Sequence, residues 1–238
     1  MNAVIDAGNT IIKLGIFDKD ILIERHSFNT ILELNSFISH ISIENVILSS
    51  VIEKSDRIIS FHVSGEKIIL SPQLFLPVHN LYSTPATLGA DRIAGACGAW
   101  LLYPDQPSLV IDIGTCINYE FVNKKGEYMG GAISPGVKMR FESMHYFTAK
   151  LPIAPPVENA TLIGDSTIGC LQTGVMNGIL EEIKGIIDRY QTAHPTPQVI
   201  LSGGDAHFFE NHLNTSIFVA PELVLMGLNS ILLYNVKS

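Results

Sequence analysis

Charged residues are scarce in this chain. They make up 16% of its 238 residues, against 47% hydrophobic residues, and the formal net charge is −8. A general nucleic-acid binder needs a basic face to neutralise phosphates, so this composition argues against that class of protein. The mean hydropathy of +0.29 is high for a soluble monomer. We expect the surplus of apolar residues to form an oligomer interface.

Cysteine and long apolar runs are also rare. The three cysteines, Cys97, Cys116 and Cys170, show neither a zinc spacing nor a disulfide framework, which is typical of a reducing cytoplasm. No apolar run reaches the ~20 residues of a membrane helix, and no signal-peptide pattern precedes the first strand. We therefore expect a cytoplasmic protein with neither a membrane nor a nucleic acid as its partner.

Two common nucleotide-binding motifs are absent, namely the G-x-x-x-x-G-K-[ST] P-loop and G-x-G-x-x-G after a strand. Residues 4–17 instead read V-I-D-A-G-N-T-I-I-K-L-G-I-F. This pattern predicts a strand that ends in Asp6, a polar turn at residues 8–10, and a second strand that contains Lys13. The turn can bind phosphate oxygens, and Asp6 can hold Mg²⁺. From this segment alone, an ordinary hairpin with a polar turn is an equally good interpretation.

A second copy of this pattern lies much later in the chain. Residues 108–115 read S-L-V-I-D-I-G-T, again an apolar strand followed by Asp112 and Thr115. A third element, residues 199–205, is a strand that runs into a Gly-Gly turn. The ordered trio is typical of the two phosphate loops and the adenosine loop of the actin, Hsp70 and sugar-kinase superfamily. We therefore predict an α/β fold of two ribonuclease-H-like (actin-like ATPase) domains with a cleft between them.

The hydrophobic periodicity predicts an order of elements that fits this fold. In the first half we expect a hairpin at 4–17, strands at 21–25, 45–51 and 67–70, and helices at 30–40, 53–60 and from 91. In the second half we expect strands at 108–112, 117–122, 199–202 and 216–219, and helices at 137–148, 167–190 and from 221. Prolines and polar residues cluster at Tyr103–Pro107, which predicts domains at residues 1–106 and 107–238.

Two of the expected helices are rich in small residues. Those that follow Asp91 suit close packing against a neighbouring element. The second helix carries Gly169, Gly174 and Gly178 on its early face, and glycine costs ~1 kcal/mol relative to alanine inside a helix. We expect another subunit's helix or a ligand to approach that face. The local pattern of Asp91 and Arg92 is also compatible with a simple helix cap and a surface charge.

Residues 80–92 read N-L-Y-S-T-P-A-T-L-G-A-D-R. With D-A-G-N-T-I-I-K, D-I-G-T, G-G-A-I-S-P-G and S-G-G-D-A in this order, the chain resembles the type III pantothenate kinases over essentially its whole length. The L-G-A-D-R and G-G-x-I-x-P-G elements are the most specific to that family. The resemblance implies ATP-dependent phosphorylation of pantothenate to 4′-phosphopantothenate, the first step of coenzyme A biosynthesis, by a homodimer.

The resemblance also implies roles for individual residues. Asp91 is the expected general base, Asp112 the expected ligand of a monovalent cation (potassium or ammonium), and Asp6 the expected ligand of the Mg²⁺ that accompanies ATP. The residues expected to bind ATP and its phosphates are Asp6, Gly8, Asn9, Thr10, Lys13, Thr115, Gly203 and Gly204. Those expected to bind pantothenate are Tyr82, Gly89, Ala90, Asp91, Arg92 and Thr167.

Two other functions stay open. A nucleotide-binding regulatory protein, like the accessory factors named for toxin-gene regulation, can use the same fold. Such a protein need not keep all four of Asp6, Asp91, Arg92 and Asp112. A kinase of this fold that acts on another small alcohol is the third possibility. Asn118 and Glu120 depart from the family pattern, and they bear on ATP affinity and cation preference rather than on the reaction class.

Overall fold

A computed structural model of the chain describes residues 1–8, 11–50, 58–213 and 215–236. The contacts divide the chain into two compact units. The first comprises Met1–Asp105, Gly126–Met129 and Glu222–Ser238, and the second comprises Gln106–Lys125 and Gly130–Pro221. A boundary thus falls within the segment Tyr103–Pro107, but the C-terminal helix groups with the first unit. The division into ribonuclease-H-like domains at residues 106 and 107 stays a prediction.

The first unit contains a sheet with the strand order β3-β2-β1-β4-β5. Strands β1 (Asn2–Ala7), β2 (Ile12–Asp18) and β3 (Ile21–Phe28) are antiparallel neighbours, whereas β4 (Asn45–Ser50) and β5 (Lys67–Ile69) join in parallel. The predicted hairpin and the three further strands are confirmed. The predicted helix at residues 53–60 falls largely outside the described residues.

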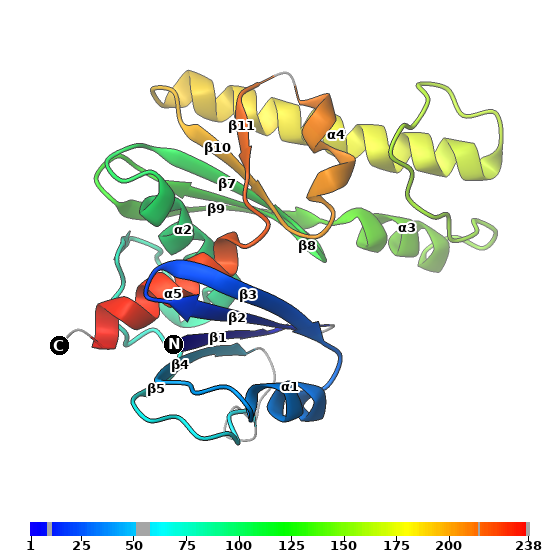
Figure 1. Cartoon of the computed structure of the whole chain (residues 1–238). Coiled ribbons are helices and arrows are strands. Elements are labelled where there is room, and N and C mark those ends of the chain that lie inside the picture. Colours follow the sequence, from blue (N-terminus) through cyan, green and yellow to red (C-terminus); the bar gives the residue numbers. More distant parts are fainter. Residues whose placement is uncertain (9–10, 51–57, 214, 237–238) are drawn as a thin grey trace. The chain divides into compact units, whose positions relative to one another are not determined.

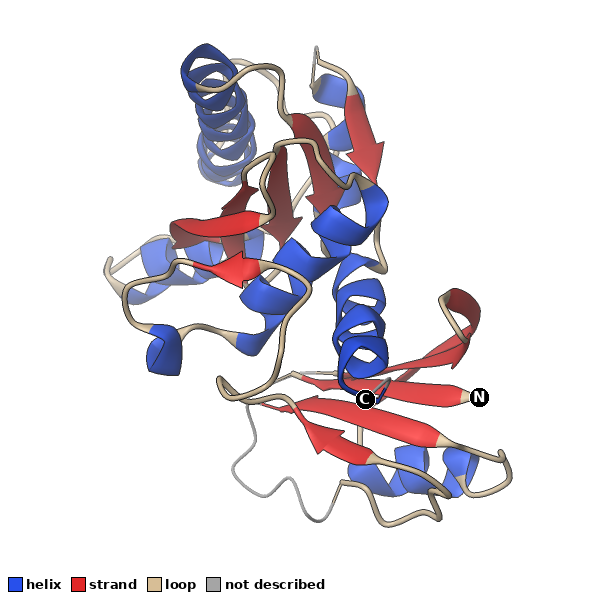
Figure 2. Cartoon of the chain, turned by 90° about the vertical axis from the view of Figure 1, so that its left-hand side faces the viewer, coloured by secondary structure: helices blue, strands red, loops and turns tan. Residues whose placement is uncertain are grey.

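One face of this sheet packs on helix α1 (Ile31–Ile38). Alternate residues of β1, among them Ala3 and Ile5, are fully buried and share a core with Leu34 and Ile38 of the helix, as the period of two in a strand requires. The predicted cap is confirmed, because the Thr30 hydroxyl accepts a hydrogen bond from the backbone N–H of Glu33 at 3.2 Å. Figure 2 shows α1 lying against this sheet.

The other face of the sheet carries helix α5 (Leu223–Val236), which packs closely on α2 (Ala90–Leu102) (Figure 1). A Cβ on Gly227 would lie 1.8 Å from the carbonyl oxygen of Ala94, and one on Gly98 would lie 2.4 Å from that of Leu223. No larger side chain fits at either position. The expectation that the small residues after Asp91 allow a close helix contact is therefore confirmed.

The second sheet has the strand order β11-β10-β7-β8-β9-β6. Its strands are β6 (His79–Asn80), β7 (Ser108–Ile113), β8 (Cys116–Val122), β9 (Glu127–Pro135), β10 (Gln198–Ser202) and β11 (Ile217–Val219). The sequence did not predict β9, because Gly130 and Gly131 weaken the strand signal. The position of β9 beside β8 explains why residue 131 is a glycine, since a Cβ there would lie 1.6 Å from the carbonyl oxygen of Tyr119 in β8.

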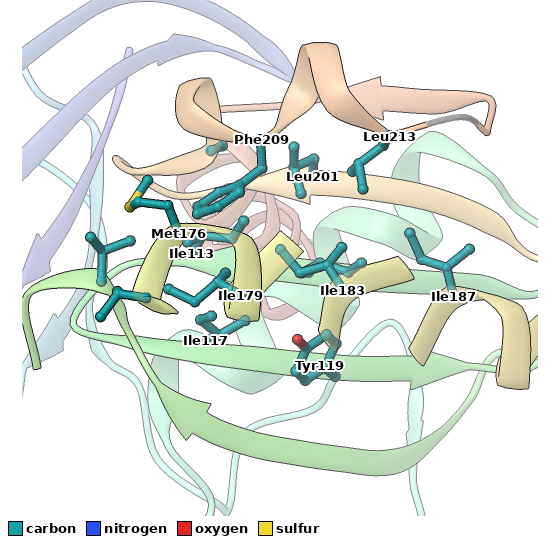
Figure 3. Packing of buried hydrophobic residues seen from close by; sticks show 14 of the residues in the cluster. Ile113, Ile117, Tyr119, Met176, Ile179, Ile183, Ile187, Leu201, Phe209 and Leu213 are labelled. Carbon is teal, nitrogen blue, oxygen red and sulfur yellow. The ribbon is translucent and has the colours of Figure 1, made fainter. Parts of the chain in front are cut away.

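Helices α3 (Val137–Tyr146) and α4 (Thr167–Ala193) belong to the second unit, and Ser166 caps α4 by accepting a hydrogen bond from the backbone N–H of Gly169. Ile179, Ile183 and Ile187 of α4 pack on the sheet in one core (Figure 3). Short 3₁₀ turns occur at Pro85–Thr87, Ala206–Phe208 and Glu210–His212. Within the described part of the chain, no helix is both long and apolar enough to cross a membrane.

Candidate active site

Asp6 lies between two polar side chains that the strand register places beside it. On one side β2 pairs Asp6 with Lys13, and on the other side β4 pairs it with Ser49. Directly paired residues in neighbouring strands point to the same face of a sheet. The hydroxyl of Ser49 donates a hydrogen bond to Oδ1 of Asp6 at 3.1 Å. The end of β1 therefore presents a carboxylate that is flanked by an ammonium group and a hydroxyl.

The environment of Asp6 disfavours a negative charge. Burial raises its pKa above the ordinary aspartate value, and the nearby charge of Asp91 raises the pKa further. Lys13 and the hydrogen bond from Ser49 act in the opposite direction but do not cancel the effect. A carboxylate that is partly desolvated and repelled by a second carboxylate is suited to bind a cation.

Asp91 occupies the first turn of α2, which brings it from a distant part of the sequence to the neighbourhood of Asp6. Its side chain is exposed, and its Oδ1 accepts a hydrogen bond from the backbone N–H of Arg92 at 2.9 Å. Gly89 makes room for this carboxylate, because a Cβ there would lie 2.6 Å from Oδ1 of Asp91. The Leu88-Gly89-Ala90-Asp91-Arg92 segment thus presents an accessible carboxylate at a helix start, where a negative charge is favoured.

Arg92 is buried beside Tyr82. Only 7% of Arg92 is exposed, and the central carbon of its guanidinium group lies 5.4 Å from the centre of the Tyr82 ring. Its Nη1 donates a hydrogen bond to the Tyr82 hydroxyl at 3.4 Å, and Tyr82 stacks on the fully buried Tyr128. A guanidinium group held in this way is preorganised to bind an anion through its planar fork.

The second unit repeats the strand arrangement around Asp112. Strand β8 pairs Asp112 with Asn118 in an antiparallel register, and β10 pairs it with Ser202 in parallel. The neighbours of Asp6 have the same arrangement, with Lys13 and Ser49 in the corresponding places. The two copies differ in charge, because asparagine occupies the place of the lysine.

Three loops meet at the end of β7. A Cβ on Gly203 would lie 2.5 Å from Oδ1 of Asp112, and the backbone N–H of Asp205 donates to the carbonyl oxygen of Ile113 at 3.0 Å. From a third segment, Gly136 donates its N–H to the carbonyl oxygen of Thr115 at 3.1 Å. Gly203 has φ of +93°, a conformation that glycine adopts without strain. The Gly-Gly turn and the second phosphate loop therefore lie together.

The structure groups most of the predicted residues into two sets, each within one unit. Asp6, Lys13, Tyr82, Gly89, Asp91 and Arg92 belong to the first, and Asp112, Thr115, Gly203 and Gly204 belong to the second. Thr167 is exposed at the start of α4 and lines a shallow hollow with Met144 and Cys170. Asn9 and Thr10 lie outside the described residues.

Sequence reasoning missed three residues of these sets. Ser49 is the last residue but one of β4, and Ser202 is the last residue of β10; they pair with Asp6 and Asp112. The only local sign was a serine close to the end of a buried strand. Gly136 belongs to the G-G-A-I-S-P-G segment, whose contact with the second phosphate loop is a matter of tertiary packing. Glycine is common just before a helix, so its position between Pro135 and α3 gave no sign of that contact.

The protein offers few ligands for a magnesium ion around Asp6. These ligands suit an ion that is also bound by a substrate better than an ion that the protein binds alone. Among the described residues, no group of three or more histidine, cysteine, aspartate or glutamate side chains is placed to hold a metal. Mg²⁺ in phosphoryl-transfer sites is bound by one or two carboxylates together with substrate phosphates. The carboxylate of Asp6, whose charge is disfavoured in the protein alone, meets that requirement.

Comparison with known proteins decides the family. A sequence model of the type III pantothenate kinases matches residues 3–189. The chain belongs to the type III pantothenate kinase family. Among its relatives, the type III pantothenate kinase of Cytophaga hutchinsonii is 41% identical over 99% of this chain and 100% of its own length, and that of Phocaeicola vulgatus is 41% identical over 100% of both. The predicted family is thus confirmed.

Solved structures confirm the predicted fold class. A protein from Campylobacter jejuni that was assigned to the Baf family of transcriptional activators superposes with a TM-score of 0.64 at 20% identity, covering 99% of this chain and 100% of its own. A protein from Listeria monocytogenes assigned as an N-acetylmannosamine kinase superposes with a TM-score of 0.52 at 15% identity, covering 98% of both chains. At these identities the likeness shows the fold alone, which is that of the actin-like ATPases and sugar kinases.

Proposed function

We propose that this protein transfers the γ-phosphoryl group of ATP to the primary hydroxyl of pantothenate and so makes 4′-phosphopantothenate, the first intermediate on the route to coenzyme A. The observation that carries the proposal is that Asp91 and Arg92 open helix α2, with Asp91 close enough to Asp6 to raise its pKa, in a chain that belongs to the type III pantothenate kinase family. The three side chains supply a base, an anion-binding group and a cation ligand, which are the parts that a phosphoryl transfer to an alcohol needs.

Asp91 acts as the general base in this proposal. The pantothenate hydroxyl oxygen forms a bond to the γ-phosphorus, the bond from that phosphorus to the β,γ-bridging oxygen breaks, and ADP leaves. The hydroxyl proton passes to the carboxylate of Asp91, which is accessible at the helix start. A positioned base of this kind contributes ~10²- to 10⁴-fold to the rate.

Arg92 binds the carboxylate of pantothenate, because its guanidinium group is oriented by Tyr82 and can hold two oxygens at once. The remaining groups proposed to contact pantothenate are Tyr82, Gly89, Ala90 and Thr167. ATP and pantothenate are both anions, and the net charge of the protein is −8. The attraction therefore has to come from a few placed cations, of which Arg92 and Lys13 are two.

The nucleotide is proposed to lie on the two phosphate loops and the Gly-Gly turn. Its phosphates are held by Gly8, Asn9, Thr10, Lys13 and Thr115, and the nucleoside lies over Gly203 and Gly204. Asp6 is the proposed ligand of the Mg²⁺ that ATP brings, and Asp112 is the proposed ligand of potassium or ammonium. When bound, these ions offset negative charge as the phosphoryl group moves.

We further propose that the working form is a homodimer. The second unit exposes large apolar side chains, which include Tyr146, Phe147, Ile153, Leu162 and Ile163. Large exposed apolar patches often mark a contact with another protein. The proposed location is the cytoplasm, with which the three free thiols Cys97, Cys116 and Cys170 agree.

The regulatory alternative is not favoured. The likeness to the Baf-family protein rests on 20% identity, whereas relatives that are 41% identical over the whole chain are type III pantothenate kinases. A kinase that acts on a different small alcohol shares every feature of the site, so only the substrate distinguishes it from the proposed function.

The test is a coupled assay of ADP release with purified protein, ATP and Mg²⁺. Pantothenate is compared with a panel of other primary alcohols, each in potassium chloride and in sodium chloride of equal ionic strength. Phosphorylation of pantothenate, with a strong requirement for potassium, supports the proposal. Preference for another alcohol identifies the related kinase, and ATP binding without any turnover identifies a regulatory protein.

A further inference from the structure

A network of polar side chains joins helix α3 to the segment that precedes it. Arg140 of α3 donates from Nε to the carbonyl oxygen of Pro135 at 2.9 Å, and from Nη2 to the hydroxyl of Ser134 at 3.0 Å. Both acceptors belong to the G-G-A-I-S-P-G segment, one of the two elements most specific to the family. The guanidinium group thus binds this segment at two places.

Glu182 of α4 holds Arg140 from the other side. Nη2 of Arg140 donates to Oε2 of Glu182 at 2.5 Å, and the hydroxyl of Tyr119, which is buried, donates to Oε1 at 2.9 Å. Tyr119 lies in the core beneath α4 (Figure 3). Burial raises the pKa of Glu182, but the hydrogen bonds from Arg140, Tyr119 and Ser134 outweigh burial and hold it below the usual glutamate value. Glu182 is therefore a charged acceptor that anchors Arg140 to the core.

The segment that Arg140 holds lies directly against the second phosphate loop. Gly136 donates its N–H to the carbonyl oxygen of Thr115 at 3.1 Å, and a Cβ on Gly136 would lie 2.1 Å from the carbonyl oxygen of Gly114. The two backbones touch without a side chain between them. A shift of residues 134–136 therefore moves the loop that contains Gly114 and Thr115.

We propose that Arg140 and Glu182 are positioning residues that hold the Gly114–Thr115 backbone in the conformation that binds the phosphates of ATP. The proposal rests on the proposed function only in naming ATP as the ligand of that loop. The proposal gives neither residue a direct contact with ATP. They act through Ser134, Pro135 and Gly136, so their effect is on the geometry of the loop.

A purely stabilising ion pair is the simpler interpretation, and the same helix offers one for comparison. Lys138 and Glu142 lie one turn apart in α3 with 3.6 Å between Nζ and Oε1, and their side chains are largely exposed. Such pairs contribute little to stability. Arg140 differs because its guanidinium group reaches three acceptors in two other elements, β9 and α4, and Glu182 is bound in turn by the buried Tyr119. Lysine has no such fork and cannot replace it.

The experiment compares Arg140→Gln with Lys138→Gln, which removes one positive charge from the same helix. Binding of ATP with Mg²⁺ is measured by isothermal titration calorimetry, and KM values for ATP and pantothenate are measured from initial rates. We expect Arg140→Gln to weaken ATP binding and raise the KM for ATP about tenfold or more, since small displacements of positioning groups are costly. The KM for pantothenate should stay within about twofold, and Lys138→Gln should behave as wild type.

Two further variants separate positioning from stability. Arg140→Lys keeps the charge, and we expect it to retain the melting temperature but not the ATP affinity. Arg140→Gln combined with Glu182→Gln should lose no more ATP affinity than either single change, because the residues act as one unit. Should Arg140→Gln not fold, Arg140→Lys is judged by the same ATP criterion.

ATP affinity equal to wild type in a folded Arg140 variant overturns the proposal, as does a loss of ATP affinity that Lys138→Gln shares. An Arg140 variant that loses affinity for ATP and for pantothenate equally also overturns the proposal. The proposed function fails separately, if the wild-type protein binds ATP but does not phosphorylate pantothenate. In that event the calorimetric comparison still decides whether Arg140 positions the phosphate loop.

Discussion

Asp6 and Asp91 lie far apart in the sequence but belong to the same unit, and the charge of Asp91 adds to the effect of burial in raising the pKa of Asp6. The two carboxylates differ in their surroundings. Asp6 is flanked by Lys13 and Ser49, whereas Asp91 is accessible at the start of a helix. Like charges that are brought together in this way favour a cation between or beside them. In the proposed function, Asp6 is the cation ligand and Asp91 is the base.

The first prediction concerns the base. We expect Asp91→Asn to lower kcat for pantothenate by ~10²- to 10⁴-fold, because the amide cannot accept the hydroxyl proton. The fold should survive, since the side chain is exposed and asparagine Oδ1 can still accept the hydrogen bond from the N–H of Arg92. Asp20→Asn, an exposed acid of the same unit, is the control for rate and for melting temperature. Unchanged turnover in Asp91→Asn would refute the base assignment.

The second prediction concerns Asp6 and pH. Its pKa is raised in the folded protein, so the folded state is favoured by this group below about pH 3.8, the ordinary aspartate value, and loses that advantage as pH rises through the folded pKa. At pH 7 the charged carboxylate thus costs stability. We expect Asp6→Asn to melt at a higher temperature than wild type at pH 7, with a difference that shrinks towards pH 3, while turnover is lost. A lower melting temperature at pH 7 would contradict this.

The third prediction concerns the contact between α2 and α5. A Cβ on Gly227 would lie 1.8 Å from the carbonyl oxygen of Ala94, so Gly227→Ala should destabilise the protein by ~1–3 kcal/mol or more. Gly185 of α4 has nothing within 4 Å of its would-be Cβ. Gly185→Ala should therefore stabilise the helix by ~0.5–1 kcal/mol. Urea unfolding of both variants measures the two effects, which should have opposite signs.

The fourth prediction concerns the monovalent cation. Strand β2 pairs Lys13 with Asp6, and strand β8 pairs the uncharged Asn118 with Asp112. In the proposed function, Lys13 supplies the positive charge beside Asp6, and the bound monovalent cation supplies the positive charge beside Asp112. We expect Asn118→Lys to retain activity without potassium, and to lose the rise in melting temperature that potassium relative to sodium gives the wild type. Asn159→Lys, an exposed position of the same unit, is the control. An undiminished potassium requirement in Asn118→Lys would count against this equivalence.

The fifth prediction concerns the proposed homodimer. Leu162 is 86% exposed in the second unit, and Leu32 is 81% exposed in the first. We expect Leu162→Glu to convert a dimer to a monomer in sedimentation velocity, because a charge buried in an apolar interface is costly. Leu32→Glu, the matched change in the first unit, should leave the dimer intact. If Leu162→Glu dimerises with unchanged affinity, this surface is not the dimer interface.

Local patterns in the sequence were enough to predict much of the fold. The alternation in residues 4–17, the Thr30 cap and the small residues after Asp91 each predicted an element that the structure contains. These features act over a few residues, so the sequence carries them directly. The motifs also placed Asp6 and Asp112 at the ends of buried strands, where the structure has them.

Only the tertiary structure decided which residues from distant segments lie next to those motifs. Ser49 neighbours Asp6 because β4 pairs in parallel with β1, and such a register depends on the packing of both faces of the sheet. The same holds for Gly131, whose lack of a side chain makes sense only against Tyr119, and for α5, which packs on the first unit from the far end of the chain. Contacts between distant segments depend on how two surfaces fit, and no local window of sequence contains both surfaces.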